Sequence, residues 1–338
     1  MITDKVFFLY DVGPQSRLEW LASAFPDGEV EWLAMKYNEK NRIYRWRKPL
    51  LFLSYIDLAV RSLLKSRPND DIISWNFIIG AIVGVICHFF RLKRTILSLN
   101  MISHNKGGII ALVRRAVYNY AFSYNGFYFT VNSKETLADY IKEYDKINER
   151  KAFVLPDAYL PIYTRKKFTG NNSYIFCGGE AQRDWKIFFE AARRLPELSF
   201  VGVGRKKYMP EDNYILDNVT MYYDIEEDKF DSLLENASIV TLPLLTTKPA
   251  GLIVVFKSIF LSKPIITTRT SSIENYLTNG ESAVLLEIGD LDGFVKAIND
   301  IYYDVTASER LTKEALRTAT KHSPEKYSQF IFEILQKH

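Results

Sequence analysis

The segment KPAGLIVVFKSIFLSKPIITT, residues 248–268, contains a turn, an apolar helix and a strand in succession. A Pro-Ala-Gly turn at 249–251 precedes the apolar stretch, and Lys-Pro separates that stretch from the β-branched run at 265–268. The apolar segment SIVTLPLL at 238–245 predicts another strand just before the turn. Strand, helix and strand in this order predict a βαβ unit, which belongs to a parallel sheet.

The same alternation extends through the whole chain. In the second half, strands are expected at 172–179, 198–204, 218–224 and 282–287, with helices at 183–195 and 226–237. In the first half, strands are expected at KVFFLYD, EVEWLA, DIISW, TILSLN, FYFTV and AFVL. These elements predict an α/β fold of two Rossmann-like, doubly wound domains that face each other across a cleft.

The domain boundaries follow from one stretch without periodicity. Residues 156–171 contain prolines, charges and a glycine but no apolar repeat, which is typical of a linker. We therefore expect a first domain at 1–158 and a second at 159–322. An amphipathic helix in 323–338 is expected to pack back toward the first domain.

Composition excludes several classes of protein. Of 338 residues, 47% are hydrophobic and 25% charged, which is typical of a globular protein, and the net charge of +4 does not favour a nucleic-acid partner. Two cysteines and four histidines show no metal-ligand spacing, so neither a metal site nor a cofactor is expected. The longest apolar run, at 78–90, is shorter than the roughly 20 residues of a spanning helix, which favours a buried helix and a cytoplasmic protein.

A ligand site is expected where the helix of the opening segment begins. Ligands of doubly wound sheets bind at the carboxyl ends of the strands, where helix N-termini present free N–H groups. The amides of Gly251, Leu252 and Ile253 would there bind an anion, and Gly251 permits close approach because it has no Cβ. The alternative is that Gly251 only begins a buried helix.

Other nucleotide motifs are absent from the sequence. Neither a dinucleotide fingerprint nor a Walker A sequence occurs, although VGVGRKK contains two glycines after a strand. GDLDG at 289–293 contains a D-x-D that could hold a metal–diphosphate, but Asp290 or Asp292 is better interpreted as a helix cap.

Five stretches together resemble a known family. They are FTVNSKETLADYIKEY (129–144), KAFVLPDAY (151–159), CGGEAQRDWKIFFEAARRLPELSFVGVG (177–204), AGLIVVFKSIFLSKPIITT (250–268) and SSIENYLTNGESAVLLEIGDLDGFVKAI (271–298). In this order they resemble GT-B fold glycosyltransferases, particularly the retaining enzymes of family 4, the glycosyl transferases group 1. The resemblance covers the chain from about residue 127 to the end.

The resemblance implies an activity. It implies transfer of a sugar from a nucleotide-diphosphate sugar to a glycan or polyprenyl-linked glycan, with retention and without metal, as in polysaccharide biosynthesis. Two alternatives remain open: a catalytically degenerate GT-B protein that acts as a partner subunit, and an epimerase of the nucleotide sugar.

The resemblance also implies roles for individual residues. Arg183 matches a cation that neutralises the donor diphosphate, a role that suits a leaving group gaining charge. On the donor side the resemblance further implies Gly179, Tyr223, Asp224, Gly251, Leu252 and Ile253. His104 matches a loop histidine near the sugar, and Asp11, Gly13 and Asn100 are expected on the acceptor side.

Two lysines depart from the family pattern. Lys248 and Lys257 stand about where the family has two glutamates, and an ammonium group cannot accept hydrogen bonds from ribose hydroxyls. Lys257 would pair with a phosphate, or turn away while Lys248 serves the diphosphate, or face solvent as an ordinary snorkelling lysine.

A basic and aromatic stretch at 42–65 is typical of a surface that lies on anionic lipid. Residues 91–94 and the pair Arg114-Arg115 add further charge. Such a surface would place the protein at the inner face of the membrane, close to a polyprenyl-linked acceptor. The alternative is a basic loop that caps an ordinary helix.

Overall fold

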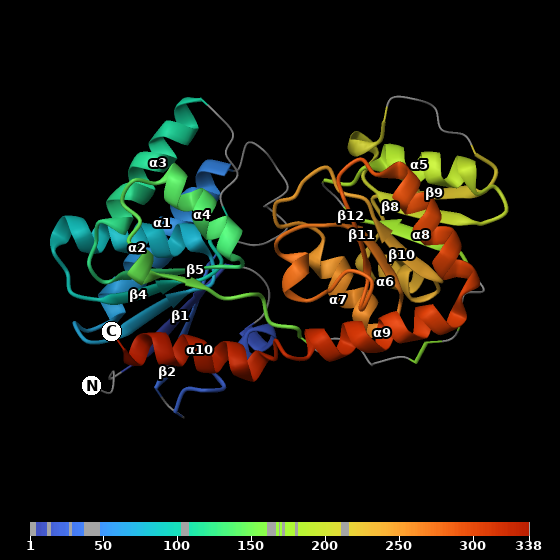
Figure 1. Cartoon of the computed structure of the whole chain (residues 1–338). Helices are drawn as coiled ribbons and strands as arrows, with labels where there is room; N and C mark the ends of the chain where they lie inside the picture. Colours follow the sequence, from blue (N-terminus) through green and yellow to red (C-terminus); the bar gives the residue numbers. More distant parts are fainter. Residues whose placement is uncertain are drawn as a thin grey trace. The chain divides into compact units, whose positions relative to one another are not determined.

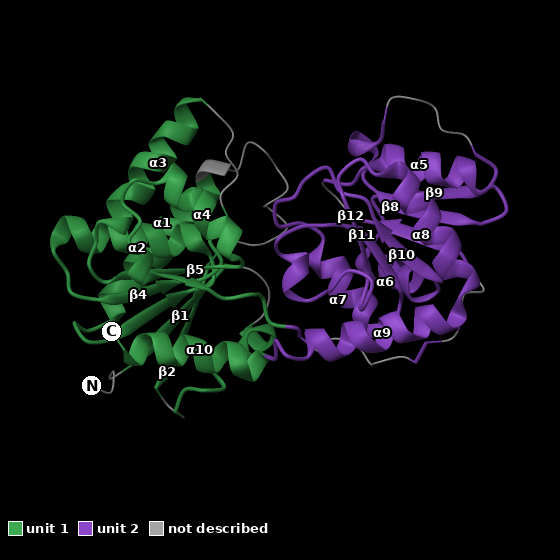
Figure 2. Ribbon diagram, viewed as in Figure 1, with its two compact units in different colours: residues 1–158, 324–338 green, residues 159–323 purple. Residues whose placement is uncertain are grey.

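The chain forms two compact units, residues 1–158 with 324–338 and residues 159–323 (Figure 2). The computed structural model describes residues 5–11, 15–26, 29–36, 48–102, 108–160, 167–168, 170, 173–179, 182–210 and 216–337, without the side chains of 48 and 49.

The described part of unit 1 contains six parallel strands in the order β2-β1-β3-β4-β5-β6 (Figure 1). The strands are β1 Val6–Tyr10, β2 Val30–Ala34, β3 Asp71–Ser74, β4 Thr95–Ser98, β5 Phe127–Val131 and β6 Ala152–Val154. The helices are α1 Lys48–Lys65, α2 Phe77–Phe90, α3 Ile109–Phe122, α4 Lys134–Glu143 and α10 Pro324–Gln336, with short 3-10 turns η1 Gln15–Arg17, η2 Glu19–Ala22 and η5 Glu149–Lys151.

Both faces of this sheet are covered, as the continuous apolar strands predict. Phe7 and Leu9 of β1 belong to the core that α1 and α2 cover. Phe8 points to the other face and packs edge-on against Phe25, which in turn contacts Phe332 of α10. The C-terminal helix therefore completes the core of unit 1.

The described part of unit 2 contains six parallel strands in the order β12-β11-β10-β7-β8-β9. The strands are β7 Ile175–Gly178, β8 Phe200–Gly204, β9 Val219–Tyr223, β10 Ile239–Leu242, β11 Ile265–Thr268 and β12 Val284–Leu286. The helices are α5 Trp185–Arg194, α6 Glu227–Glu235, α7 Leu252–Phe260, α8 Leu291–Tyr303 and α9 Val305–Ala319, with 3-10 turns η6 Lys206–Tyr208 and η7 Ile273–Asn275. The predicted pair of doubly wound parallel sheets is thus confirmed.

The apolar run at 78–90 forms most of α2, and as far as Cys87 it is largely buried, as predicted, whereas Phe89 and Phe90 at its end are exposed. Eight residues of α2 are buried, among them Ile79, Val83 and Cys87. Among the helices that the structure describes, none is both long and apolar enough to cross a membrane.

The capping interpretation of GDLDG is also confirmed. Asp290 caps α8 and its Oδ1 accepts a hydrogen bond from the Gly293 N–H at 2.9 Å. Asp292 forms an ion pair with Arg194 of α5. Both carboxylates therefore have structural partners.

Candidate functional site

In unit 2 the strand order reverses between β7 and β10, which are hydrogen-bonded neighbours. The loops that follow these two strands are fixed to each other by their backbones. The Asp184 N–H donates to Pro243 O at 2.8 Å, and the Leu245 N–H donates to Gln182 O at 3.0 Å. Because ligands of open α/β sheets bind at this point of strand reversal, the two loops define the candidate site.

Arg183 lies in the first of these loops and is buried, with 7% of its surface exposed. Its Nε donates to the carbonyl oxygen of Gly178 at 2.8 Å, which fixes the guanidinium at the carboxyl end of β7. Burial lowers the pKa of Arg183, yet an arginine keeps its charge at any ordinary pH. A fixed cation therefore lies at the point of strand reversal.

Gly179 accommodates this guanidinium. Its φ of +131° lies in the region that L side chains rarely adopt, and a Cβ at this position would collide with Nη2 of Arg183. A glycine is therefore required here for two reasons, the backbone angle and the space that the arginine occupies.

The second loop ends at the N-terminus of α7. Gly251 has a φ of +82° and precedes the helix, whose first hydrogen bond runs from the Val255 N–H to Gly251 O at 3.0 Å. The N–H groups of Leu252 and Ile253 come before this bond and point out of the helix end. The N-terminus of α7 thus presents backbone donors and a partial positive charge.

The guanidinium of Arg183 and the N-terminus of α7 lie close together. A Cβ placed on Gly251 would lie 4.0 Å from Nη1 of Arg183, so the guanidinium lies beside the end of α7. Two positive groups at one place repel each other unless an anion lies between them. This geometry suits an anion, and the binding of an anion at Gly251 stays a prediction.

Lys257 lies one and a half turns into α7 and is buried, with 5% of its surface exposed. Its Nζ lies 2.9 Å from Oε1 of Glu227 and 2.6 Å from Oδ1 of Asp231, both on α6. The ammonium also lies 5.6 Å from the centre of the Phe230 ring. The solvent-facing alternative for Lys257 is therefore wrong, because the side chain connects α7 to α6 inside the unit.

Residues 172–304 match the family model of the glycosyl transferases group 1. This segment contains β7, Arg183 and all of α7. The chain carries a group 1 glycosyltransferase domain. No curated protein sequence matches the chain.

Solved structures similar to most or nearly all of the chain share its fold at low sequence identity. Anabaena Alr3699/HepE, in complex with UDP, has a TM-score of 0.69 at 14% identity, over 99% of this chain and 100% of that one. An α,α-trehalose-phosphate synthase (UDP-forming) from Burkholderia vietnamiensis has a TM-score of 0.68 at 10% identity, with 99% and 98% covered. A point mutant of S. aureus TarM, in complex with fondaparinux, α-GlcNAc-glycerol and UDP, has a TM-score of 0.63 at 12% identity, with 83% and 58% covered. The GT-B fold is thereby confirmed.

Three further donor-side predictions lie at the same edge of the glycosyltransferase domain. Tyr223 ends β9 with 42% of its surface exposed. Asp224 follows with a φ of +50° and donates its N–H to Gly204 O at 3.2 Å. Lys248 is exposed in the loop before α7, where its N–H donates to Oγ1 of Thr246 at 3.0 Å. Their roles toward a donor stay predictions.

Among the residues predicted for an acceptor, Asp11 lies at the reversal point of the sheet of unit 1, between β1 and β3. Its carboxylate is buried and Oδ2 accepts a hydrogen bond from Nδ2 of Asn76 at 2.7 Å. Asn76 in turn caps α2 through its Oδ1, which accepts the Ile78 N–H at 2.9 Å. Sequence analysis missed Asn76, although its place between a strand and an apolar helix is an N-cap signal.

The remaining residues predicted in the first unit are Asn100, His104 and Gly13. Asn100 follows β4 with a φ of +50°, donates its N–H to Oγ1 of Thr130 at 2.9 Å, and hydrogen-bonds Asp157 through its side chain. His104 and Gly13 lie outside the described residues.

Asp157 is a titratable group that sequence analysis did not single out. It follows β6, and burial raises its pKa to about 6 from an ordinary value of 3.8, while the hydrogen bond from Asn100 lowers it. Its carboxylate, together with burial, raises the pKa of the neighbouring Tyr327 of α10. The group therefore lies where the C-terminal helix joins the carboxyl edge of unit 1.

The raised pKa of Asp157 predicts a pH-dependent stability. The folded state binds this proton more tightly than the unfolded state, so the free energy of unfolding falls as pH rises from about 4 to about 6. The full effect is about 3 kcal/mol. Urea titrations of Asp157→Asn should show a gain over the wild type at pH 7 that vanishes near pH 4. An equal difference at both pH values would contradict the assigned pKa.

Gly179→Ala is expected to weaken binding of a nucleoside diphosphate at least roughly tenfold, because the new Cβ displaces the Arg183 guanidinium while the rest of the loop persists. Gly280→Ala is the matched control. Gly280 also has a positive φ, +76°, but a Cβ there meets nothing within 4 Å. Titration calorimetry should show the wild-type affinity for a nucleoside diphosphate in the control; equal losses in both variants would assign the effect to backbone strain alone.

Proposed function

We propose that this chain transfers a sugar from a UDP-sugar to a glycan or lipid-linked glycan, with retention and without a metal ion, in polysaccharide biosynthesis. The proposal rests on one observation: Arg183 lies beside the N-terminus of α7, at the point where the strand order of unit 2 reverses. UDP is favoured as the nucleotide because HepE has been determined with UDP and with UDP-glucose, and TarM with UDP.

In the proposed reaction the donor diphosphate lies between the Arg183 guanidinium and the N–H groups of Leu252 and Ile253. Negative charge grows on the leaving phosphate as the glycosidic bond breaks, and these donors stabilise it because they are already fixed in place. The departing phosphate oxygen takes the proton of the acceptor hydroxyl, which accounts for retention without a separate base. Tyr223 and Asp224, at the end of β9, are proposed to line the nucleoside.

We assign Lys257 to the framework of this site. Its pairing with Glu227 and Asp231 holds α6 beside α7, the helix whose N-terminus binds the diphosphate. Lys248, which is exposed in the loop before α7, is the lysine proposed to reach the phosphates.

We further propose peripheral contact with an anionic membrane through residues 42–65. Residues 42–47 lie outside the described part, but α1 supports the proposal. Its side chains Tyr55, Leu58 and Ala59 enter the core, while Phe52, Leu53, Val60 and Leu64 are exposed. A lipid-linked acceptor at the inner face of the membrane would then be within reach of the enzyme.

Release of UDP from UDP-glucose, measured with and without a lipid-linked glycan acceptor, tests the function. Release that requires the acceptor supports transfer. Interconversion of the sugar without release would instead indicate an epimerase. A chain that neither binds nor turns over UDP-sugars would be a degenerate partner subunit.

A further inference from the structure

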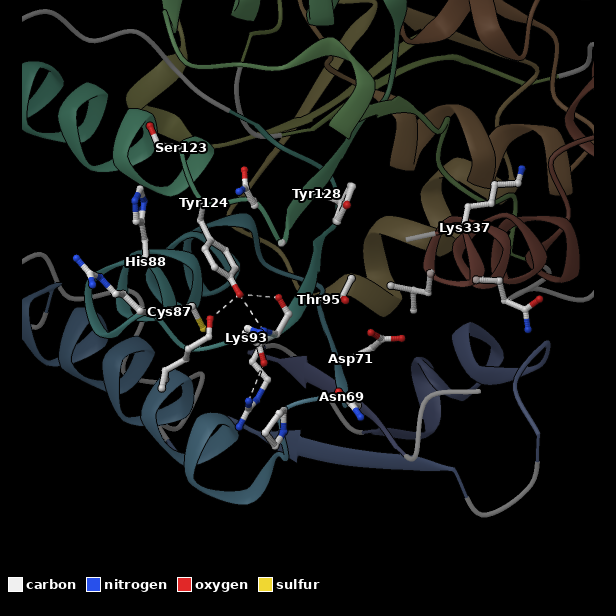
Figure 3. A pocket seen from close by; sticks show the side chains of 18 residues that line it. Asn69, Asp71, Cys87, His88, Lys93, Thr95, Ser123, Tyr124, Tyr128 and Lys337 are labelled. Atoms are coloured by element: carbon white, nitrogen blue, oxygen red, sulfur yellow. Dashed lines mark hydrogen bonds between the residues drawn. The ribbon is translucent and has the colours of Figure 1, made fainter. Parts of the chain in front are cut away.

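Unit 1 contains a pocket of about 950 Å³ at the amino ends of β3, β4 and β5 (Figure 3). This edge of the sheet is opposite to the carboxyl edge at which Asp11 and Asn100 lie. The lining comes from the segment 68–71 that leads into β3, the end of α2 and the loop after it, the residues that follow α3, and the end of α10. The pocket is therefore separate from the acceptor side of the unit.

The lining is strongly cationic. Arg91, Lys93, Arg94 and Lys337 line the pocket against one acidic residue, Asp71. Arg94 is held by hydrogen bonds within the unit, since its Nε donates to Oγ of Ser66 at 2.9 Å and its Nη2 donates to Ser66 O at 2.6 Å. Arg91 and Lys93 are exposed, and within the described residues neither forms a salt bridge.

The loop that carries these cations is held in place by Tyr124. Its hydroxyl accepts the Arg94 N–H at 2.8 Å and lies 2.8 Å from the carbonyl oxygens of Leu92 and Arg94 (Figure 3). Three helices end around the pocket, and their partial negative charges explain part of this accumulation of cations. The helix ends do not explain why exposed apolar side chains lie beside the cations.

Two phenylalanines precede the cations directly. Phe89 and Phe90 end α2 with 68% and 65% of their surfaces exposed, and their rings touch edge to face. His88, the residue before them, stacks on Tyr120 of α3 with ring centres 4.5 Å apart. The end of α2 therefore contacts α3 near the C-terminus of that helix.

The outward face of α3 is itself apolar. Ile109, Ile110, Leu112, Val113 and Val117 are exposed by 38% to 83%. Ile109, Leu112 and Val113 have the i, i+3 and i+4 spacing of one helical face, and Ile110, Val113 and Val117 have the i, i+3 and i+7 spacing. Arg115, the charged residue on this face, pairs with Asp145. The face thus contributes apolar area, while Arg91 and Lys93 contribute charge.

We propose that the tip of α2 (Phe89, Phe90, Arg91 and Lys93) and the outward face of α3 (Ile109–Val117) form a docking surface for an anionic lipid bilayer. The cations bind lipid phosphates at the rim of the pocket, and the apolar side chains enter the interfacial region. A symmetric pairing with a second copy is disfavoured, because it would bring Arg91 and Lys93 close to cations of their own kind. The inference extends the membrane contact proposed for residues 42–65.

Sedimentation with phosphatidylcholine vesicles, with and without phosphatidylglycerol, tests this surface. The wild type should bind only the anionic vesicles, less tightly at high salt. Arg91→Gln with Lys93→Gln should weaken this binding roughly 30-fold. Phe89→Ser with Phe90→Ser should weaken it more than about tenfold. The matched control, Lys206→Gln with Lys207→Gln, removes two exposed lysines of η6 in unit 2 and should bind as the wild type does.

UDP binding of each variant keeps this test separate from the proposed function, since the altered residues of the docking surface all lie outside unit 2. Normal UDP affinity together with lost vesicle binding supports the surface. Vesicle binding by both variants at wild-type strength would overturn it, and would leave residues 42–65 as the contact. A wild type that ignores vesicles but forms dimers, which Phe89→Ser with Phe90→Ser separates, would also overturn it.

Discussion

Arg183→Gln is expected to weaken UDP binding about 100-fold while the domain stays folded. The variant keeps a polar side chain of similar length but removes the buried charge that lies beside the N-terminus of α7. Loss of a desolvated cation that binds a phosphate costs about 3 kcal/mol or more. Arg183→Lys should recover only part of the affinity, because an ammonium lacks the planar fork of donors that matches a phosphate.

Arg193→Gln provides the control for this prediction. Arg193 lies on α5, in the same unit, where it is exposed and pairs with Glu190. Removing this charge should leave UDP affinity unchanged in titration calorimetry. If both arginine variants bind UDP as the wild type does, Arg183 has no part in the donor site.

Lys257→Glu is expected to have the largest effect on stability. This change restores the acidic residue type of the family pattern, but it places a third carboxylate beside Glu227 and Asp231. Removing one partner from a buried ion pair costs about 3–5 kcal/mol, and the new repulsion adds to that figure. Glu227 is largely exposed and can turn to solvent, so Asp231 carries most of the effect.

Urea unfolding at neutral pH measures this loss, and three further measurements identify its cause. Lys257→Met should be destabilised less than Lys257→Glu. The pair Lys257→Met and Asp231→Leu should recover much of the stability, because a well-packed apolar pair can replace a buried ion pair. Lys257→Glu should also regain stability in acid, where carboxylates are protonated. A Lys257→Glu variant as stable as the wild type would show that the ion pairs of Lys257 with α6 do not stabilise the domain.

The fold was predictable because its signals are local. Each strand of unit 2 is a short apolar run between turn residues, and each helix has its own amphipathic period, so neighbouring residues decide each element. The closeness of Arg183 to Gly251 was predictable for a related reason. In a parallel sheet, every loop that follows a strand lies at the same edge, so Arg183 after β7 and Gly251 after β10 had to lie near each other.

The partners of Lys257 were not predictable in this way. The side chain pairs with α6 because of how two helices lie against one face of the sheet, and no sequence spacing within α7 encodes that relation. The network of Asp11 depends likewise on the adjacency of β1 and β3, which are far apart in sequence. The pKa of Asp157 reflects burial that the whole unit produces.

Comparing the affinities of UDP and uridine for the wild type tests the central claim most directly. The two ligands differ only in the diphosphate, the group assigned to Arg183 and the N-terminus of α7. UDP is expected to bind on the order of 100-fold more tightly than uridine, in titration calorimetry at low ionic strength. Equal affinities, or no binding of UDP at all, would contradict a donor-diphosphate site in this domain.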